Sequence, residues 1–174
     1  MQIQPFTALT PDAVLDALDS IGLRSDGRLL ALNSYENRVY QIGIEESAPV
    51  IAKFYRPLRW TDEAILEEHR FAQELAEREI PVVAPTADKA GRTLHQFEGF
   101  RFAIYPRQPG RAPELDDPAT LEWMGRFIGR IHAVGAIEPF VHRPTLTIEN
   151  FGVAPSRHVL ANGFIPPDLE AAYS

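Results

Sequence analysis

The chain has no cysteine among its 174 residues, which excludes disulfide bonds, thiolate metal sites and cysteine nucleophiles. It also lacks an apolar run long enough to span a bilayer, and Met1 to Pro5 lack the basic and apolar regions of a signal peptide. We therefore expect a cytoplasmic protein with no membrane association. The net charge is −7 and the only basic cluster is Lys53, Arg56 and Arg59, so nucleic acid is not an expected partner.

What is present is the composition of a globular protein, with 45% hydrophobic and 24% charged residues. The length suits one domain, or one domain and the start of another. A first helix is predicted over residues 11–21, because Thr10 suits the N-cap, Pro11 the first helical position and Gly22 the end. Alternating side chains then predict three strands, at residues 28–32, 38–44 and 49–55, with a polar turn at residues 33–37.

The strongest helix pattern covers residues 61–78, where Thr61 suits the N-cap and Trp60 can pack on Ile65. Beyond it we predict a hairpin (92–97 and 100–105), a helix (118–134), a long irregular segment (142–167) and the opening of a helix (168–174). The apolar stripe of the helix over 118–134 consists of Leu121, Met124, Ile128 and Ile131.

Two charged residues stand in apolar surroundings. Lys53 lies in the middle of the predicted strand over residues 49–55, and Glu68 shares a helix face with Ala64, Phe71 and Leu75. The neighbouring helix face is wholly charged, so we expect its Glu67 to lie in solvent while Glu68 points inward.

Burying either charge is costly unless the two are paired. A strand lysine paired with a glutamate on the next helix is the arrangement by which kinases hold a lysine against nucleotide phosphates. These two residues alone also fit a structural role, in which Lys53 reaches water at a sheet edge and Glu68 bonds a backbone group.

The order of the neighbouring elements favours the nucleotide site. The turn before the lysine strand carries Asn33 and Ser34, whose backbone N–H groups and hydroxyl could bond phosphate oxygens. The strand that ends at Ile104 and Tyr105 leads into a stretch rich in proline and glycine, where adenine could bond the hinge backbone. This order predicts an α+β fold, with a kinase-like small lobe built from an antiparallel sheet and one αC-type helix, followed by the start of a helical second lobe. We place the small lobe at residues 1–105, the hinge at 106–116 and the second lobe at 117–174.

Four segments, at residues 32–40, 53–57, 65–69 and 142–145, resemble the bacterial stress response kinase A family. That family is similar to the wider aminoglycoside and choline phosphotransferase group, and the resemblance covers residues 9–173. It implies a serine/threonine protein kinase that uses ATP and Mg²⁺ on a protein substrate. By this resemblance Ser34 contacts ATP, Lys53 orients the phosphates and Glu68 holds Lys53.

The catalytic loop of the family has a histidine, an aspartate base and a magnesium-binding asparagine, whereas no His-x-Asp occurs in this sequence. We therefore expect no catalytic residue in this chain, with the base and the Mg²⁺ ligands beyond residue 174, and little or no activity from the chain alone. The five histidines show no ligand spacing, so no metal site is expected here.

Two other functions stay open. The first is a small-molecule kinase of the same fold that acts on an amino alcohol or an aminoglycoside. The second is a kinase-like module that binds nucleotide or a partner without catalysis. The sequence does not give the phosphate acceptor, the oligomeric state or the regulatory signal.

Overall fold

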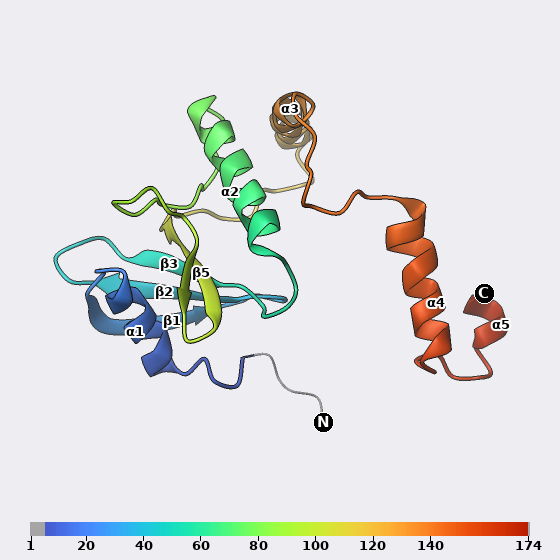
Figure 1. Ribbon diagram of the computed structural model, residues 1–174. Helices are drawn as coiled ribbons and strands as arrows, with labels where there is room; N and C mark the ends of the chain where they lie inside the picture. The colour runs from blue at the N-terminus through green and yellow to red at the C-terminus, as the bar shows by residue number, and fades with distance from the viewer. Residues whose placement is uncertain (1–5, 174) are drawn as a thin grey trace. The chain divides into compact units, whose positions relative to one another are not determined.

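The computed structural model describes residues 6–173, so the predictions for residues 1–5 and for Ser174 lie outside the described residues. The chain divides into two compact units, Met1–His142 and Arg143–Ser174, and each is described by itself (Figure 1). The predicted boundaries of the lobes and hinge stay a prediction. Within the described part of the chain, no helix has both the length and the apolar character needed to cross a membrane.

The first unit is built on an antiparallel sheet of five strands, as predicted. The spatial order is β1-β2-β3-β5-β4, so the lysine strand β3 lies in the centre between β2 and β5. The strands are β1 (Ser25–Leu32), β2 (Arg38–Ile44), β3 (Val50–Phe54), β4 (His95–Phe97) and β5 (Phe100–Pro106). The central place of β3 surrounds Lys53 with paired backbone on both sides.

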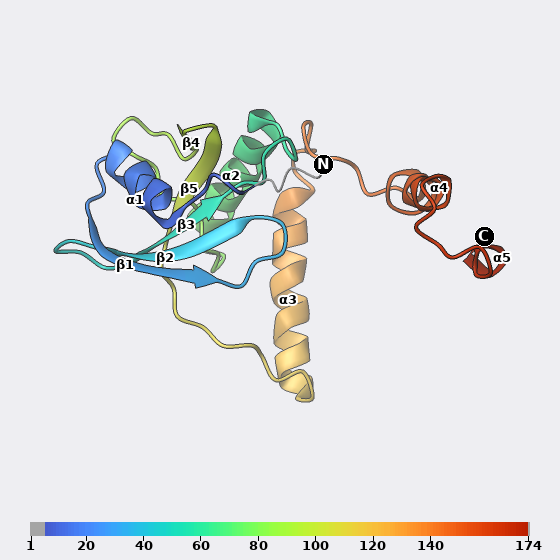
Figure 2. The ribbon, with the colours of Figure 1, turned by 90° about the horizontal axis from the view of Figure 1, so that it is seen from below.

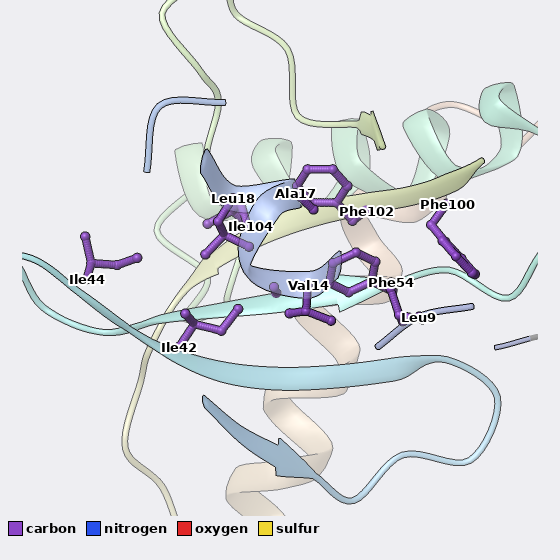
Figure 3. Packing of buried hydrophobic residues seen from close by; sticks show 11 residues of the cluster. Leu9, Val14, Ala17, Leu18, Ile42, Ile44, Phe54, Phe100, Phe102 and Ile104 are labelled. Carbon is purple, nitrogen blue, oxygen red and sulfur yellow. The ribbon is translucent and has the colours of Figure 1, made fainter. Parts of the chain in front are cut away.

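Helix α1 (Pro11–Ser20) covers one face of this sheet. Its start is capped as predicted, because the Thr10 hydroxyl accepts a hydrogen bond from the Ala13 amide. Side chains alternate along β3, so Ala52 and Phe54 join this core while Lys53 faces the other way. Figure 3 shows the resulting cluster, which contains Leu9, Val14, Ala17, Leu18, Ile42, Ile44, Ala52, Phe54, Phe100, Phe102 and Ile104.

Helix α2 (Asp62–Glu77) lies against the opposite face of the sheet (Figure 2). The Thr61 hydroxyl accepts a hydrogen bond from the Ala64 amide, which confirms the predicted N-cap. Trp60 and Ile65 belong to one apolar cluster with Tyr55, the residue after β3, as the predicted contact between them requires. This cluster packs the start of α2 against the sheet.

Helix α3 (Pro118–Gly135) begins after Asp117, whose carboxylate accepts from two amides of the first turn. It packs on α2, but only Ile131 of the predicted apolar stripe takes part, and Leu121 and Ile128 are 50% and 45% exposed. The face of α3 that contacts α2 therefore differs from the predicted stripe. The apolar cluster at this contact consists of Phe71, Leu75, Ile80, Val82, Phe127, Ile131 and Val134.

Residues 149–161 of the second unit are helical, so the prediction of an irregular segment over residues 142–167 was wrong there, while residues 142–147 and 162–167 are irregular as predicted. A π-helical turn (Glu149–Val153) runs directly into α4 (Ala154–Ala161), and α5 (Glu170–Tyr173) follows as the predicted helix opening. The π-helical turn has its physical cause at Pro155, which has no N–H and whose ring crowds the carbonyl four residues earlier. The Ala154 amide donates to the Glu149 carbonyl instead, and this wider turn carries the helix past the proline.

Candidate functional site

Lys53 and Glu68 form the predicted pair. Nζ of Lys53, on β3, lies 3.1 Å from Oε1 of Glu68, on α2. The two side chains are 23% and 37% exposed, so the pair lies at the wall of an open cleft rather than in a sealed core. Lys53 points there because residues of odd number in β3 face α2, and its strand neighbours are Val39 on β2 and Ala103 on β5. The ammonium also lies 4.8 Å from the centre of the Tyr55 ring.

The pair opens onto a cleft of about 420 Å³. Its charged groups, Lys53 and Glu68, stand together, and most of the remaining wall is apolar or aromatic. The lining consists of Val39, Ile51, Lys53, Glu68, Val83, Tyr105, Pro106 and Gln108. An apolar wall with one ammonium and one carboxylate suits a flat apolar ring that carries an anionic group.

Ile104 and Tyr105, predicted to bind nucleotide at the end of the strand before the hinge, lie on different faces of the sheet. Tyr105 lines the cleft, but the side chain of Ile104 lies in the core on the α1 face of the sheet. The backbone carbonyl of Ile104 accepts a hydrogen bond from the Thr86 amide at 2.8 Å. Only Tyr105 therefore offers a side chain to a ligand, because successive residues of β5 point to opposite faces.

The turn at residues 33–37 is held by its own hydrogen bonds. The Ser34 hydroxyl donates to the Asn37 carbonyl at 2.9 Å, and Asn33 is exposed. The turn is also tied to the start of α2, because Glu36 accepts from Arg59 at 3.0 Å and from Trp60 at 2.8 Å. Neither Asn33 nor Ser34 lines the cleft described above.

Burial raises the pKa of the Glu36 carboxyl, but the hydrogen bonds from Arg59 and Trp60 outweigh it, and the net pKa lies below its ordinary value. The turn is thereby anchored through a carboxylate that stays charged.

The prediction that Glu67 lies in solvent was wrong. Its side chain is 5% exposed, and its two carboxylate oxygens accept hydrogen bonds from the backbone amides of Val141 at 2.6 Å and His142 at 3.0 Å. The helical pattern predicts only one buried side for α2, because it considers the helix without its neighbours. The segment that follows α3 packs on a second side, and this contact comes from residues more than seventy positions away in sequence.

A buried polar group near the pair was not predicted from the sequence. The ring of His69 lies between the hydroxyls of Tyr55, 2.6 Å from Nε2, and Thr93, 2.9 Å from Nδ1. The Tyr105 hydroxyl lies 3.1 Å from that of Tyr55 and 3.5 Å from Nε2 of His69. The histidines lack the spacing of metal ligands, so no role was predicted for His69. The signal that could have indicated His69 is its position directly after Glu68, which lines the cleft.

Burial controls the protonation of this group. His69 is 1% exposed, and burial lowers its pKa to about 4, so the ring is neutral at pH 7. Burial raises the pKa of Tyr105 to about 12, so its hydroxyl keeps its proton. A neutral imidazole between hydroxyls satisfies the hydrogen-bonding groups behind Lys53 without adding a charge.

Comparison with known proteins places this geometry in context. The sequence model of the phosphotransferase enzyme family matches residues 28–168. Stress response kinase A of Shigella flexneri is 45% identical over 168 residues, and that of Escherichia coli strain K12 is 44% identical; each match covers 97% of this chain and 51% of the relative. The serine/threonine protein kinase RdoA of Salmonella typhimurium is 40% identical with the same coverage. The chain spans about half the length of these curated relatives.

A solved structure shares the fold. The amicoumacin kinase hAmiN, in complex with AMP-PNP, Ca²⁺ and Ami, superposes with a TM-score of 0.69 over 90% of this chain and 49% of that one. The two sequences are 19% identical, so the likeness concerns the fold alone.

Proposed function

Because the chain belongs to the phosphotransferase enzyme family, we propose that its cleft binds ATP and that the whole protein is a serine/threonine kinase of the stress response. The observation that carries the proposal is the 3.1 Å pair of Lys53 and Glu68 at the wall of a cleft large enough for a nucleotide base. Identity of 40% to 45% with stress response kinases over 97% of the chain supports it. An ATP-dependent kinase works where ATP is present, so the proposal places the protein in the cytoplasm.

Each residue of the site has a role in this proposal. The Lys53 ammonium donates to phosphate oxygens, and Glu68 holds that ammonium in place so that little conformational entropy is lost on binding. Val39, Ile51 and Tyr105 exclude water from the two faces of the adenine ring. The backbone amides of Asn33 and Ser34 contact the phosphates from the turn, and the Ser34 hydroxyl joins them by exchanging the Asn37 carbonyl for a phosphate oxygen. Bound ATP would supply the phosphoryl group that is transferred.

The residues described here do not form the Mg²⁺ site that the resemblance implies. Across residues 6–173 no group of three or more His, Asp or Glu side chains is arranged to hold a metal ion. The proposal therefore assigns to this chain the binding of the nucleotide and to other parts of the whole protein the catalytic base and the metal ligands.

A small-molecule kinase is the second candidate, because hAmiN, which has the same fold, is named as a kinase of amicoumacin. The 19% identity to that kinase is far below the 40% to 45% shared with the stress response kinases. We therefore favour a protein substrate.

The two lysines of the chain provide a direct test of the ATP site. Lys53 lines the cleft and Lys89 is exposed elsewhere, so acylation followed by mass spectrometry compares the site with an internal control. ATP should slow the acylation of Lys53 and leave that of Lys89 unchanged.

A nucleotide titration completes the test. Lys53→Ala should weaken ATP binding about tenfold or more, the size expected for a lost hydrogen bond to a charged group, whereas Lys89→Ala should bind ATP like the unchanged chain. Equal acylation of Lys53 with and without ATP, or an unchanged affinity in Lys53→Ala, would refute the proposed site.

A further inference from the structure

The carboxylate of Glu67 is buried at a junction between two distant segments. It accepts the backbone amides of Val141 and His142, at 2.6 and 3.0 Å, in the segment that follows α3. A carboxylate that is 5% exposed depends on such hydrogen bonds, because burial without them is strongly unfavourable. Loss of this segment would therefore expose the Glu67 carboxylate to water and remove the two hydrogen bonds that tie α2 to the segment.

Glu67 and Glu68 are consecutive on α2, so the two carboxylates project about 100° apart around the helix axis. One binds the segment after α3 and the other binds Lys53 at the cleft. Without the two bonds to Glu67 the rotation of α2 is less restrained, and a rotation of the helix moves Glu68 relative to Lys53, because a helix rotates as a rigid body. The two contacts are therefore linked through the orientation of α2.

Packing of the helical turns after Glu67 extends the contact between α2 and this segment. One helical turn further along, the ring of Phe71 meets that of Phe140 edge-on, with centroids 5.2 Å apart. A side-chain carbon added at Gly135 would lie 3.4 Å from the Phe71 ring, so the end of α3 also approaches this helix face closely. Leu75 continues the face into the cluster shared with Val134. The end of α3 and the segment over residues 135–142 thus together hold α2 along two turns.

We propose that Glu67 is a positioning residue that couples the segment over residues 135–142 to the nucleotide cleft. While the segment is docked, Glu67 locks α2 in the rotation that presents Glu68 to Lys53. An event that pulls this segment away breaks the pair and weakens nucleotide binding. The part that concerns nucleotide rests on the proposed function, whereas the coupling of the two carboxylates does not.

The test compares Glu67→Gln with Glu77→Gln, an exposed position on the same helix, in the full chain. The side-chain amide introduced by Glu67→Gln can accept one backbone N–H but opposes the second with its own N–H₂ group. In Glu67→Gln the ratio of Lys53 to Lys89 acylation without nucleotide should rise, because Lys53 loses its partner. ATP affinity should fall about tenfold in the same variant, while Glu77→Gln should match the unchanged chain in both readouts.

A double variant separates positioning from general weakening of the fold. If Glu67 acts through Glu68, the Glu67→Gln change should have no further effect on the acylation ratio or on ATP affinity in a Glu68→Gln background. Full additivity would overturn the proposal, as would a Glu67→Gln acylation ratio equal to that of Glu77→Gln.

Two further outcomes are distinguishable. If the unchanged chain binds no ATP, the proposed function fails, but the acylation ratio still decides the coupling. If Glu67→Gln does not fold, Phe140→Ala removes a contact of the same segment from its partly exposed side and should raise the acylation ratio in the same direction. An unchanged ratio in a folded Phe140→Ala variant would then overturn the coupling.

Discussion

At the scale of single residues, the buried imidazole of His69 makes stability depend on pH. Its pKa in the folded chain is about 4, below the ordinary value of 6.5, because the ring is buried. Between these values the unfolded chain binds a proton that the folded chain does not. Stability should therefore fall as the pH drops from about 6.5 to about 4, by at most about 3 kcal/mol from this residue.

The measurement is urea unfolding at a series of pH values, with His69→Gln as the comparison. The side-chain amide of this variant can still bond the Tyr55 and Thr93 hydroxyls but takes up no proton. The variant should show a shallower loss of stability over this pH range. Burial lowers the pKa of His95 as well, so some slope should remain in both proteins. Parallel curves for the two proteins would show that His69 does not carry the effect.

The residues of the site differ in how far the sequence could reveal them. The pair of Lys53 and Glu68 was predictable because each charge interrupts an apolar pattern of its own element. Glu67 and His69 were not, because their partners lie on other segments: Val141 and His142 for the first, and Tyr55 and Thr93 for the second. A helical pattern shows which side chains share a face, but not how many faces are covered.

At the scale of the elements, the two helix caps offer a matched comparison. The Thr10 and Thr61 hydroxyls each accept a hydrogen bond from the third residue beyond, at 3.2 Å in both cases. Thr10→Ala and Thr61→Ala should each lower the free energy of unfolding by about 1 kcal/mol. Only α2 carries Glu68, so only Thr61→Ala should also weaken ATP binding. Equal ATP affinities of the two variants would contradict a role for α2 in the site.

The hairpin turn between β4 and β5 stores backbone strain. Glu98 and Gly99 both have positive φ angles, 46° and 82°, as a two-residue hairpin turn requires. Asparagine adopts this conformation more readily than glutamate, so Glu98→Asn should raise the free energy of unfolding by about 0.5 kcal/mol. Glu98→Gln removes the charge but keeps the strain. A gain in Glu98→Gln equal to that in Glu98→Asn, by urea unfolding, would attribute the effect to charge instead.

The elements themselves followed from the sequence where the local signals were consistent. The caps and alternating patterns predicted α1, α2 and β2 closely, because each element buries one side and ends at a recognisable residue. The helix over residues 149–161 was missed because the periodic pattern fades after residue 136 and prolines flank the segment. A π-helical turn lets the helix continue past Pro155, and whether such a turn forms depends on the residues of the whole helix and not on the proline alone.

At the scale of the whole molecule, the α+β fold places the lysine strand in a sheet beside one helix, as predicted from the order of the elements, and its central position in that sheet was not predicted. That order was informative because a kinase-like small lobe needs its turn, lysine and glutamate in succession. The order of the elements does not show how the steps of the reaction are divided over the whole protein, since the chain spans about half the length of its curated relatives.

Nucleotide binding and phosphoryl transfer should therefore separate in this chain. Transfer needs a carboxylate that accepts the proton of the attacking hydroxyl and metal-held neutralisation of the phosphate charge. The sequence has no His-x-Asp, and residues 6–173 present no cluster suited to a metal ion. With ATP, Mg²⁺ and a general protein substrate, the chain should produce no more labelled phosphoprotein than Lys53→Ala, although the unchanged chain should bind ATP about tenfold more tightly or better. Transfer that Lys53→Ala abolishes would instead place a working base among these 174 residues.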